Sequence, residues 1–174
     1  NNIYLIGFMG TGKTSVGKEL ARRLKRQFID LDDLIELKEK CAIRDIFAKK
    51  GEPYFRKAEK KVLKEVSAEK EFIVACGGGI VLEEENIKTM KKTGLMICLN
   101  ASPEAIIKRT SGYAHRPLLN VSGPGKQIEL LLKLRSPYYA QADKSIDTSK
   151  LSIKQAADRI AKLGAGPLFQ YEYL

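Results

Sequence analysis

The chain has 174 residues, of which 44% are hydrophobic and 30% are charged, and its net charge is +10. This composition suits one globular domain with its own core, and no apolar run approaches the roughly 18–20 residues that a membrane span needs. The positive charge admits nucleic acid as a partner, but residues 36–70 interleave eleven Lys or Arg with seven Asp or Glu. We therefore expect solvated helix faces and small anionic substrates, with neither nucleic acid nor a membrane as partner.

Strand-like runs alternate with helical patterns along the chain. The runs are Ile3–Ile6, Gln27–Ile29, Phe72–Cys76, Leu95–Leu99 and Ser145–Asp147. Helix boundaries are indicated by Gly51 as a stop, Pro53 as a start, Ser102 before Pro103 as an N-cap, and a capping box at Ser152–Gln155. This alternation predicts an α/β fold: one domain with a five-stranded parallel sheet covered by helices on both faces.

A glycine-rich turn follows the first run, with the sequence Gly7-Phe8-Met9-Gly10-Thr11-Gly12-Lys13-Thr14. Strand, glycine-rich turn, Lys-Thr and helix form the arrangement of a P-loop, whose backbone N–H groups and helix N-terminus face a phosphate group. Lys13 can reach the β- and γ-phosphates, and the Thr14 hydroxyl can bind Mg²⁺. The turn predicts a nucleoside triphosphate site made by Gly10, Thr11, Gly12, Lys13, Thr14 and Ser15.

Acidic residues end the second run, in the sequence Asp30-Leu31-Asp32-Asp33. In an extended chain Asp30 and Asp32 point to the same side, at the sheet edge where open α/β sheets bind ligands. One carboxylate can hold Mg²⁺, directly or through water, while the other orients an acceptor hydroxyl. The alternative is that an acid caps the next helix, which we favour for Asp33.

Two segments are expected to lie outside the sheet. Residues 33–67 are almost wholly helical, too long for one crossover, and we assign 33–61 to substrate binding. Residues 111–125 carry glycines around Arg116 and are expected to form a closing lid. Three consecutive glycines, 77–79, make sense where a ligand approaches the backbone closely. The tail at 165–174 has no functional assignment.

The scattered cysteines Cys41, Cys76 and Cys98 form no close pair, which favours a reducing compartment. Cys76 and Cys98 lie in strand-like runs and are expected to be buried. No signal-peptide pattern precedes the first run. We expect a cytoplasmic protein, and nothing in the sequence demands more than a monomer.

Taken in order, the motifs resemble those of the shikimate kinase family. The P-loop is followed by Asp-x-Asp at 30–32, Phe55-Arg56-x-x-Glu59, three glycines, Arg-Pro-Leu-Leu at 116–119 and Arg135-x-x-x-Tyr139. The ordered set spans residues 3–163. The resemblance implies a P-loop fold similar to nucleoside monophosphate kinases and transfer of the γ-phosphoryl group of ATP to the 3-hydroxyl of shikimate, a step toward aromatic amino acids.

The resemblance also implies roles for individual residues. Arg56 and Arg135 are expected to bind the shikimate carboxylate, and Glu59 is expected to hold Arg56 by a salt bridge. Asp32 is expected to accept hydrogen bonds from the ring hydroxyls and to act as the base or the orienting group. The backbone of Gly77, Gly78 and Gly79 is expected to meet the substrate.

On the nucleotide side, Arg116 is expected to close onto the transferring phosphoryl group beside Lys13. Arg109 and the segment after Asp147-Thr148 are expected to border the adenine. Mg²⁺, carried with ATP, is expected on Thr14 and, through water, on Asp30.

Two alternatives remain open. One is a P-loop kinase for another hydroxy acid such as gluconate, since paired arginines fit any carboxylate. The other is a nucleotide-binding module without transfer. Asp-x-Asp and the three glycines favour shikimate over the first, and the set of Lys13, Asp32 and Arg116 favours catalysis over the second.

Overall fold

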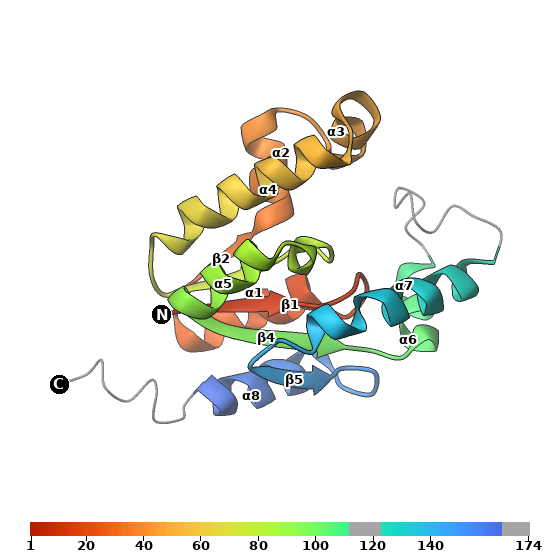
Figure 1. Cartoon of the computed structure of the whole chain (residues 1–174). Helices are drawn as coiled ribbons and strands as arrows, with labels where there is room; N and C mark the ends of the chain where they lie inside the picture. The colour runs from red at the N-terminus through yellow and green to blue at the C-terminus, as the bar shows by residue number, and fades with distance from the viewer. Residues whose placement is uncertain (112–122, 165–174) are drawn as a thin grey trace.

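The computed structural model describes residues 1–111 and 123–164, and its centre is a five-stranded sheet (Figure 1). The strands are β1 (Asn2–Ile6), β2 (Gln27–Asp30), β3 (Phe72–Ala75), β4 (Gly94–Asn100) and β5 (Lys144–Asp147). They pair in the order β2-β3-β1-β4-β5, and every pairing is parallel. The predicted parallel sheet is confirmed, with strand ends within one residue of the sequence-based bounds.

Helices lie on both faces of the sheet, as expected for parallel strands. They are α1 (Lys13–Leu24), α2 (Leu31–Glu39), α3 (Ile43–Lys50), α4 (Glu52–Ser67), α5 (Glu84–Thr93), α6 (Pro103–Thr110), α7 (Pro124–Tyr139) and α8 (Ile153–Gly164), with a 3₁₀ turn η1 (Ile80–Leu82). Alternation along β1 divides the core. Ile3 and Leu5 pack with α1 and α8, whereas Tyr4 and Ile6 pack with side chains of α2, α4, α5 and α7.

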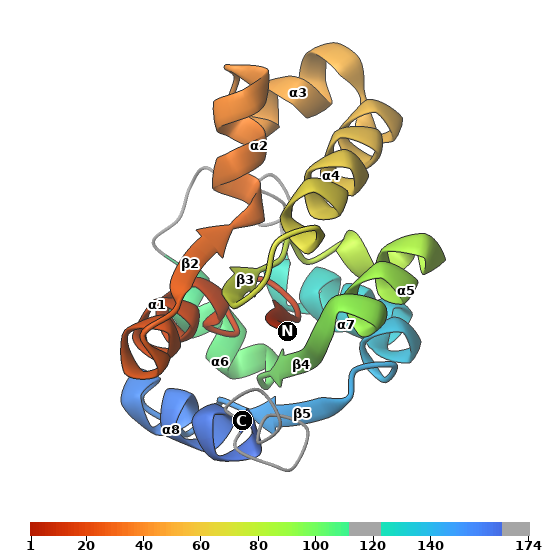
Figure 2. The same ribbon diagram turned by 90° about the vertical axis from the view of Figure 1, so that its left-hand side faces the viewer.

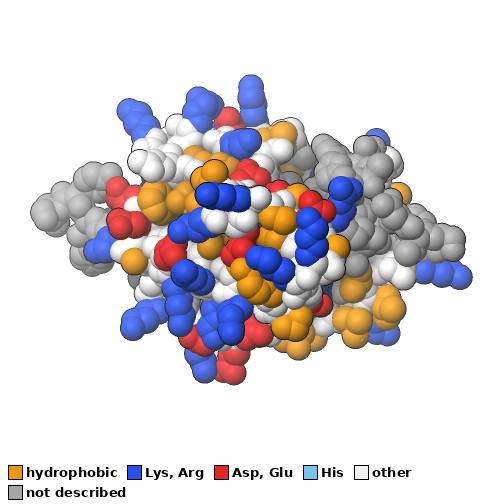
Figure 3. Space-filling model, turned by 90° about the horizontal axis from the view of Figure 1, so that it is seen from above, with side chains coloured by type: hydrophobic (Ala, Val, Ile, Leu, Met, Phe, Trp, Pro, Cys, Tyr) orange, Lys and Arg blue, Asp and Glu red, His pale blue; other side chains and the backbone are white. Residues whose placement is uncertain are grey.

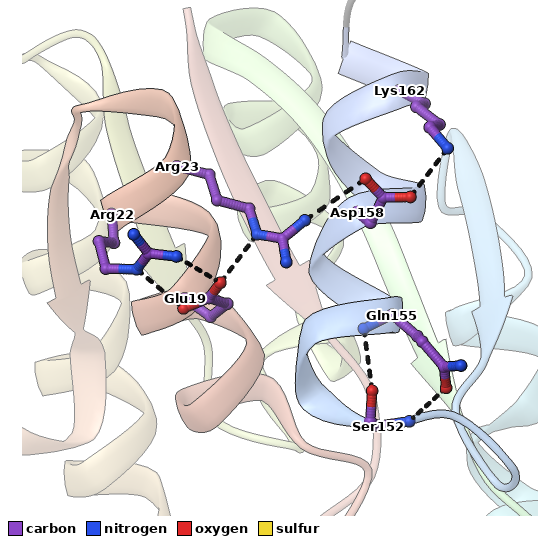
Figure 4. Close-up of polar contacts among 7 residues, drawn as sticks. All are labelled: Glu19, Arg22, Arg23, Ser152, Gln155, Asp158 and Lys162. Carbon is purple, nitrogen blue, oxygen red and sulfur yellow. Dashed lines mark hydrogen bonds and ion pairs between the residues drawn. The ribbon is translucent and has the colours of Figure 1, made fainter.

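Helices α1 and α8 pack side by side, and an ion pair links Arg23 of α1 to Asp158 of α8 (Figure 4). Arg23 donates to Oε1 of Glu19 at 2.8 Å and to Oδ1 of Asp158 at 3.4 Å. The predicted capping box is present, because the Ser152 N–H donates to Oε1 of Gln155 and the Gln155 N–H donates to Oγ of Ser152. Ion pairs near the surface contribute little individually, and the buried side chains Ala156, Ala157 and Ile160 pack α8 against the core.

Helices α2, α3 and α4 form a projection beyond the sheet (Figures 1 and 2). Gly51 ends α3 and begins α4, and Pro53 lies in the first turn of α4, as predicted. Seen from above, blue basic and red acidic side chains are mixed over the surface (Figure 3). Ion pairs such as Lys38 with Glu65 match the interleaved charge of the sequence.

Two of the three cysteine side chains lie in the core. Cys76 and Cys98 are buried, as predicted, and burial raises the pKa of both thiols. No helix in the described part of the chain is long and apolar enough to cross a membrane.

Candidate active site

The predicted P-loop joins β1 to α1. Gly10 and Gly12 have φ of 77° and 103°, a left-handed region that favours glycine. A Cβ on Gly10 would also lie 2.8 Å from Cγ2 of Thr110, so neither backbone nor space admits a larger residue there. Gly12 is the N-cap of α1 and offers no side chain to the first helical N–H groups. The helix N-terminus can therefore face an anion.

Lys13 lies folded over this loop. Its Nζ donates to the carbonyl oxygens of Gly7 at 2.7 Å and Phe8 at 2.8 Å. Thr11 Oγ1 also donates to the Phe8 carbonyl at 2.7 Å. The ammonium group thus lies within the loop, where a bound phosphate can replace the two carbonyl oxygens as its hydrogen-bond acceptor.

Asp30 connects the P-loop helix to the projection. Thr14 Oγ1 donates to Oδ2 of Asp30 at 2.8 Å, and Oδ1 accepts from the N–H of Asp32 at 3.0 Å and of Asp33 at 3.4 Å. Asp30 is therefore the N-cap of α2. The prediction that Asp33 is the cap is wrong. The premise that Asp30 and Asp32 lie in one extended segment is also wrong, because α2 begins at Leu31 and Asp32 lies in its first turn.

The three glycines at 77–79 are the point where the predicted substrate residues meet. A Cβ on Gly77 would lie 2.8 Å from Oδ1 of Asp32 and 3.1 Å from Oε2 of Glu59. On Gly79 it would lie 2.3 Å from Nη2 of Arg56. Only hydrogen atoms fit between this turn and those side chains. Side chains of the protein, and not only a ligand, therefore explain the glycines.

The middle glycine brings the turn close to the P-loop and α7. A Cβ on Gly78 would lie 3.3 Å from Nη1 of Arg135, 3.5 Å from the Gly7 carbonyl oxygen and 3.6 Å from the Tyr139 hydroxyl. The Arg135 guanidinium also lies 5.7 Å from the ring of Phe8. This turn therefore lies beside both the P-loop, predicted to bind the nucleotide, and Arg135, predicted to bind the substrate.

Two buried carboxyl groups face this turn. Burial raises the pKa of Asp32 to about 6, with the Asp30 charge adding to the rise and Lys13 opposing it. Burial likewise raises the pKa of Glu59 to about 7, against the lowering effect of Arg56. Oδ1 of Asp32 and Oε2 of Glu59 have no hydrogen-bond partner among the described residues. Both are acceptors placed to receive a donor.

The expected contact between Arg56 and Glu59 is present. Arg56 Nη1 donates to Oε1 of Glu59 at 2.9 Å, and its Nε and Nη2 lie 3.3 and 3.2 Å from Oε1 of Glu52. The Glu59 side chain is 1% exposed and that of Arg56 is 16% exposed. This one-turn pair on α4 fixes the guanidinium against Gly79.

Comparisons with known proteins give one consistent family. The family model described as shikimate kinase matches residues 9–163. The chain belongs to the shikimate kinase family. A shikimate kinase of Thermodesulfovibrio yellowstonii is 45% identical over 92% of this chain and 93% of its own, and one of Thermoanaerobacter pseudethanolicus is 44% identical over 92% and 94%. The resemblance drawn from the ordered motifs, and the enzyme class of an ATP-dependent kinase, are confirmed.

Solved shikimate kinases share the fold. The enzyme from Acinetobacter baumannii, solved in complex with shikimate, superposes with a TM-score of 0.89 at 39% identity over 93% of this chain and 91% of that one. The enzyme from Aquifex aeolicus gives 0.79 at 33% identity over 97% and 99%. The predicted P-loop fold of the nucleoside monophosphate kinase kind is confirmed.

In this member of the shikimate kinase family, Arg109 contacts the P-loop and Thr148. Its Nη1 donates to the Gly10 carbonyl at 3.2 Å and to Thr148 Oγ1 at 3.1 Å, and its Nη2 donates to the Thr148 carbonyl. Ser15 is exposed in the first turn of α1. Arg116 and most of the predicted lid lie outside the described residues.

Sequence reasoning named Tyr139 only as part of a motif and Thr148 only as the residue before the segment expected at the adenine, without a role for either side chain. Tyr139 donates from its hydroxyl to the Gly78 carbonyl at 2.6 Å, and burial raises its pKa to about 12. Its spacing of four from Arg135 on a helix was the available signal. Thr148 is buried and contacts the P-loop, but a single threonine after a strand gives no such signal.

Residues near Thr14 fit a magnesium ion. The Thr14 hydroxyl and the Asp30 carboxylate offer oxygen ligands 2.8 Å apart beside the N-terminus of α1. Among the described residues no group of three His, Cys, Asp or Glu side chains could hold a metal. The two oxygen ligands on Thr14 and Asp30 suit Mg²⁺, which takes few protein ligands and completes its shell with phosphate oxygens and water.

Proposed function

We propose that this chain transfers the γ-phosphoryl group of ATP to the 3-hydroxyl of shikimate, giving shikimate 3-phosphate and ADP. The observation that carries the proposal is the turn at 77–79, where Asp32, Arg56 and Arg135 meet beside the P-loop in a chain that matches the family over residues 9–163. A carboxylate, two guanidinium groups and a phosphate loop are the groups that this reaction needs.

The arginines and the glycine turn bind the substrate. Arg56 and Arg135 hold the shikimate carboxylate, because a planar guanidinium can bind both carboxylate oxygens. Glu59 positions Arg56, and Tyr139 braces the turn through the Gly78 carbonyl. The backbone of residues 77–79 meets the ring, with residues 33–61 as the substrate-binding region. The anchored carboxylate then fixes which hydroxyl faces the P-loop.

Asp32 orients that hydroxyl. It lies beside the turn, and its carboxylate accepts the hydroxyl hydrogen bond and receives the proton as the new P–O bond forms. The raised pKa, about 6, makes the carboxylate a better proton acceptor than an exposed aspartate while leaving it charged at pH 7. Positioning supplies most of the acceleration in phosphoryl transfer, so the carboxylate acts first as an orienting group.

On the ATP side the P-loop amides of residues 10–15 hold the phosphates and Lys13 neutralises the β- and γ-oxygens. Arg116 and the lid segment 111–125 close over the transferring group, which excludes water. Arg109 borders the adenine. Thr14 and, through water, Asp30 hold Mg²⁺, which when bound neutralises phosphate charge.

A coupled assay of ADP release tests the proposal. The enzyme is given ATP with shikimate or with gluconate at equal concentrations, and we expect turnover with shikimate. Turnover with gluconate but not with shikimate would refute the choice of substrate, and ATP binding without ADP release in the presence of either acceptor would indicate a nucleotide-binding module.

Two variants of Arg135 test the carboxylate clamp. Arg135→Ala should raise the KM for shikimate by about tenfold to a hundredfold, since one charge-assisted contact contributes about 1.5–3 kcal/mol. Arg135→Lys keeps the charge without the planar fork and should fall in between. An unchanged KM in Arg135→Ala would remove this residue from the clamp. We also propose that the protein is a cytoplasmic monomer. Size-exclusion chromatography tests the oligomeric state.

A further inference from the structure

Thr148 links the P-loop to the end of the sheet. It follows β5, is 2% exposed, and its Oγ1 lies 2.7 Å from the Thr11 carbonyl oxygen and 3.1 Å from that of Asn100. Arg109 Nη1 donates to the same oxygen at 3.1 Å. One buried hydroxyl therefore joins the P-loop, the end of β4 and the arginine predicted at the adenine.

Proton counting assigns the direction of these bonds. A hydroxyl has one proton, and the Asn100 carbonyl already accepts from the Thr148 N–H at 2.8 Å. The hydroxyl proton therefore goes to the closer Thr11 carbonyl, and the oxygen accepts from Arg109. Thr11 and Thr148 are buried and Arg109 is half-buried, so the loss of the hydroxyl would leave the Thr11 carbonyl and one N–H of Arg109 unpaired.

The bonded carbonyls determine where the P-loop amides point. In a planar trans peptide the C=O and the following N–H point in opposite directions. Arg109 holds the Gly10 carbonyl and Thr148 holds the Thr11 carbonyl. The N–H groups of Thr11 and Gly12 therefore point away from these two side chains. These amides belong to the P-loop set that is expected to face the phosphates.

We propose that Thr148 is a positioning residue for nucleotide binding, which aims the Thr11 and Gly12 amides through its bond to the Thr11 carbonyl and orients the Arg109 guanidinium. The proposal rests on the proposed function in taking ATP and ADP as the ligands. Arg109 is held at both Nη atoms, so the plane of its guanidinium is fixed and its face is available to stack on a base. The phosphate and adenine contacts are thus set by one hydroxyl.

Three variants test the proposal by isothermal titration with ADP. Thr148→Val keeps the shape and removes the hydroxyl, and we expect the Kd for ADP to rise about tenfold. Thr148→Ser keeps the hydroxyl and should bind within about twofold of the original protein. Ser145→Ala is the matched control: it removes the hydrogen bond that Nδ2 of Asn100 donates to Oγ of Ser145 between β4 and β5, has no described contact to the P-loop, and should leave the Kd unchanged.

Steady-state kinetics should show the same selectivity. In Thr148→Val the KM for ATP should rise and the KM for shikimate should not, whereas general loosening of the fold would raise both. An unchanged Kd for ADP in Thr148→Val overturns the proposal. An equal loss in Ser145→Ala, or a failure of Thr148→Ser to bind ADP, also overturns it.

Amide hydrogen exchange separates this proposal from the proposed function. Without nucleotide, exchange at residues 10–12 should be faster in Thr148→Val than in Thr148→Ser, and equal rates overturn the proposal whatever the ligand. If exchange responds as expected and shikimate is not phosphorylated, the proposed function fails while the positioning role stands. Should Thr148→Val not fold, Thr148→Ala takes its place in each comparison.

Discussion

Replacing Gly79 by alanine should weaken shikimate binding while leaving the fold intact. The new Cβ would lie 2.3 Å from Nη2 of Arg56 and 2.6 Å from its Nη1 and Cζ, distances that force the guanidinium to move. The backbone accepts alanine, because φ and ψ of Gly79 are −96° and 1°. The atoms displaced are the far end of a flexible side chain, so the strain is relieved by moving Arg56 off the turn.

The size of the effect follows from what Arg56 is proposed to hold. A charge-assisted hydrogen bond contributes about 1.5–3 kcal/mol, which corresponds to about a tenfold to hundredfold rise in the KM for shikimate. The KM for ATP should stay near its original value, because no described contact joins Arg56 to the P-loop.

Gly78→Ala is the matched control in the same turn. Its Cβ would meet Nη1 of Arg135 at 3.3 Å, a contact that a shift of a few tenths of an ångström relieves, so its KM for shikimate should rise less. Both variants are assayed by ADP release across a shikimate series, with thermal unfolding to check the fold. An unchanged KM for shikimate in a folded Gly79→Ala protein would refute the placement of Arg56 against the substrate.

Three further outcomes are expected. Asp32→Asn should lower kcat by about a hundredfold or more with little change in the KM for ATP, measured by ADP release; unchanged turnover would remove the carboxylate from the reaction. Burial raises the pKa of Glu59 from 4.5 to about 7, so the folded state binds more protons than the unfolded state between these pH values. The free energy of unfolding should therefore fall by at most about 3 kcal/mol as the pH rises through this range. Denaturant unfolding of Glu59→Gln should show a smaller fall, and an equal fall would contradict the assignment. Asp30→Asn keeps a good helix cap and should remain as stable as the original protein but need more Mg²⁺ for half-maximal rate, whereas Asp30→Ala should also lose about 1 kcal/mol of stability; equal Mg²⁺ titrations would exclude Asp30 from the metal.

The fold was predictable because local signals agreed. Apolar runs marked the strands, and Gly51, Pro53 and Ser102 marked helix ends that the structure confirms. These signals act over one or two turns of chain, so they need no knowledge of tertiary contacts. The P-loop was predictable for the same reason, since its glycine spacing is a local backbone requirement.

The sequence predicted that Asp32, Arg56 and Arg135 would lie near the three glycines, but not the geometry of their contacts. Asp32 was chosen on the premise of an extended chain, yet α2 begins at Leu31 and the carboxylate reaches the glycine turn from a helix. Asp30 rather than Asp33 caps that helix, because the cap is decided by which side chain can turn back to the free N–H groups. Contacts across the fold, such as that of Thr148 with the P-loop, leave no local pattern to find.

The unpaired acceptors at the glycine turn fit the polyhydroxylated acid that we propose as the substrate. Oδ1 of Asp32 and Oε2 of Glu59 are buried without a partner in the described structure, an arrangement that costs stability when no ligand is bound. Arg56 lies beside Gly79 and Arg135 lies beside Gly78 in the same turn. A ligand that satisfies both sides must carry hydroxyl donors at one end and a carboxylate at the other. An acid without hydroxyl groups would leave the buried acceptors unpaired, so rejection of such an acid needs no steric clash.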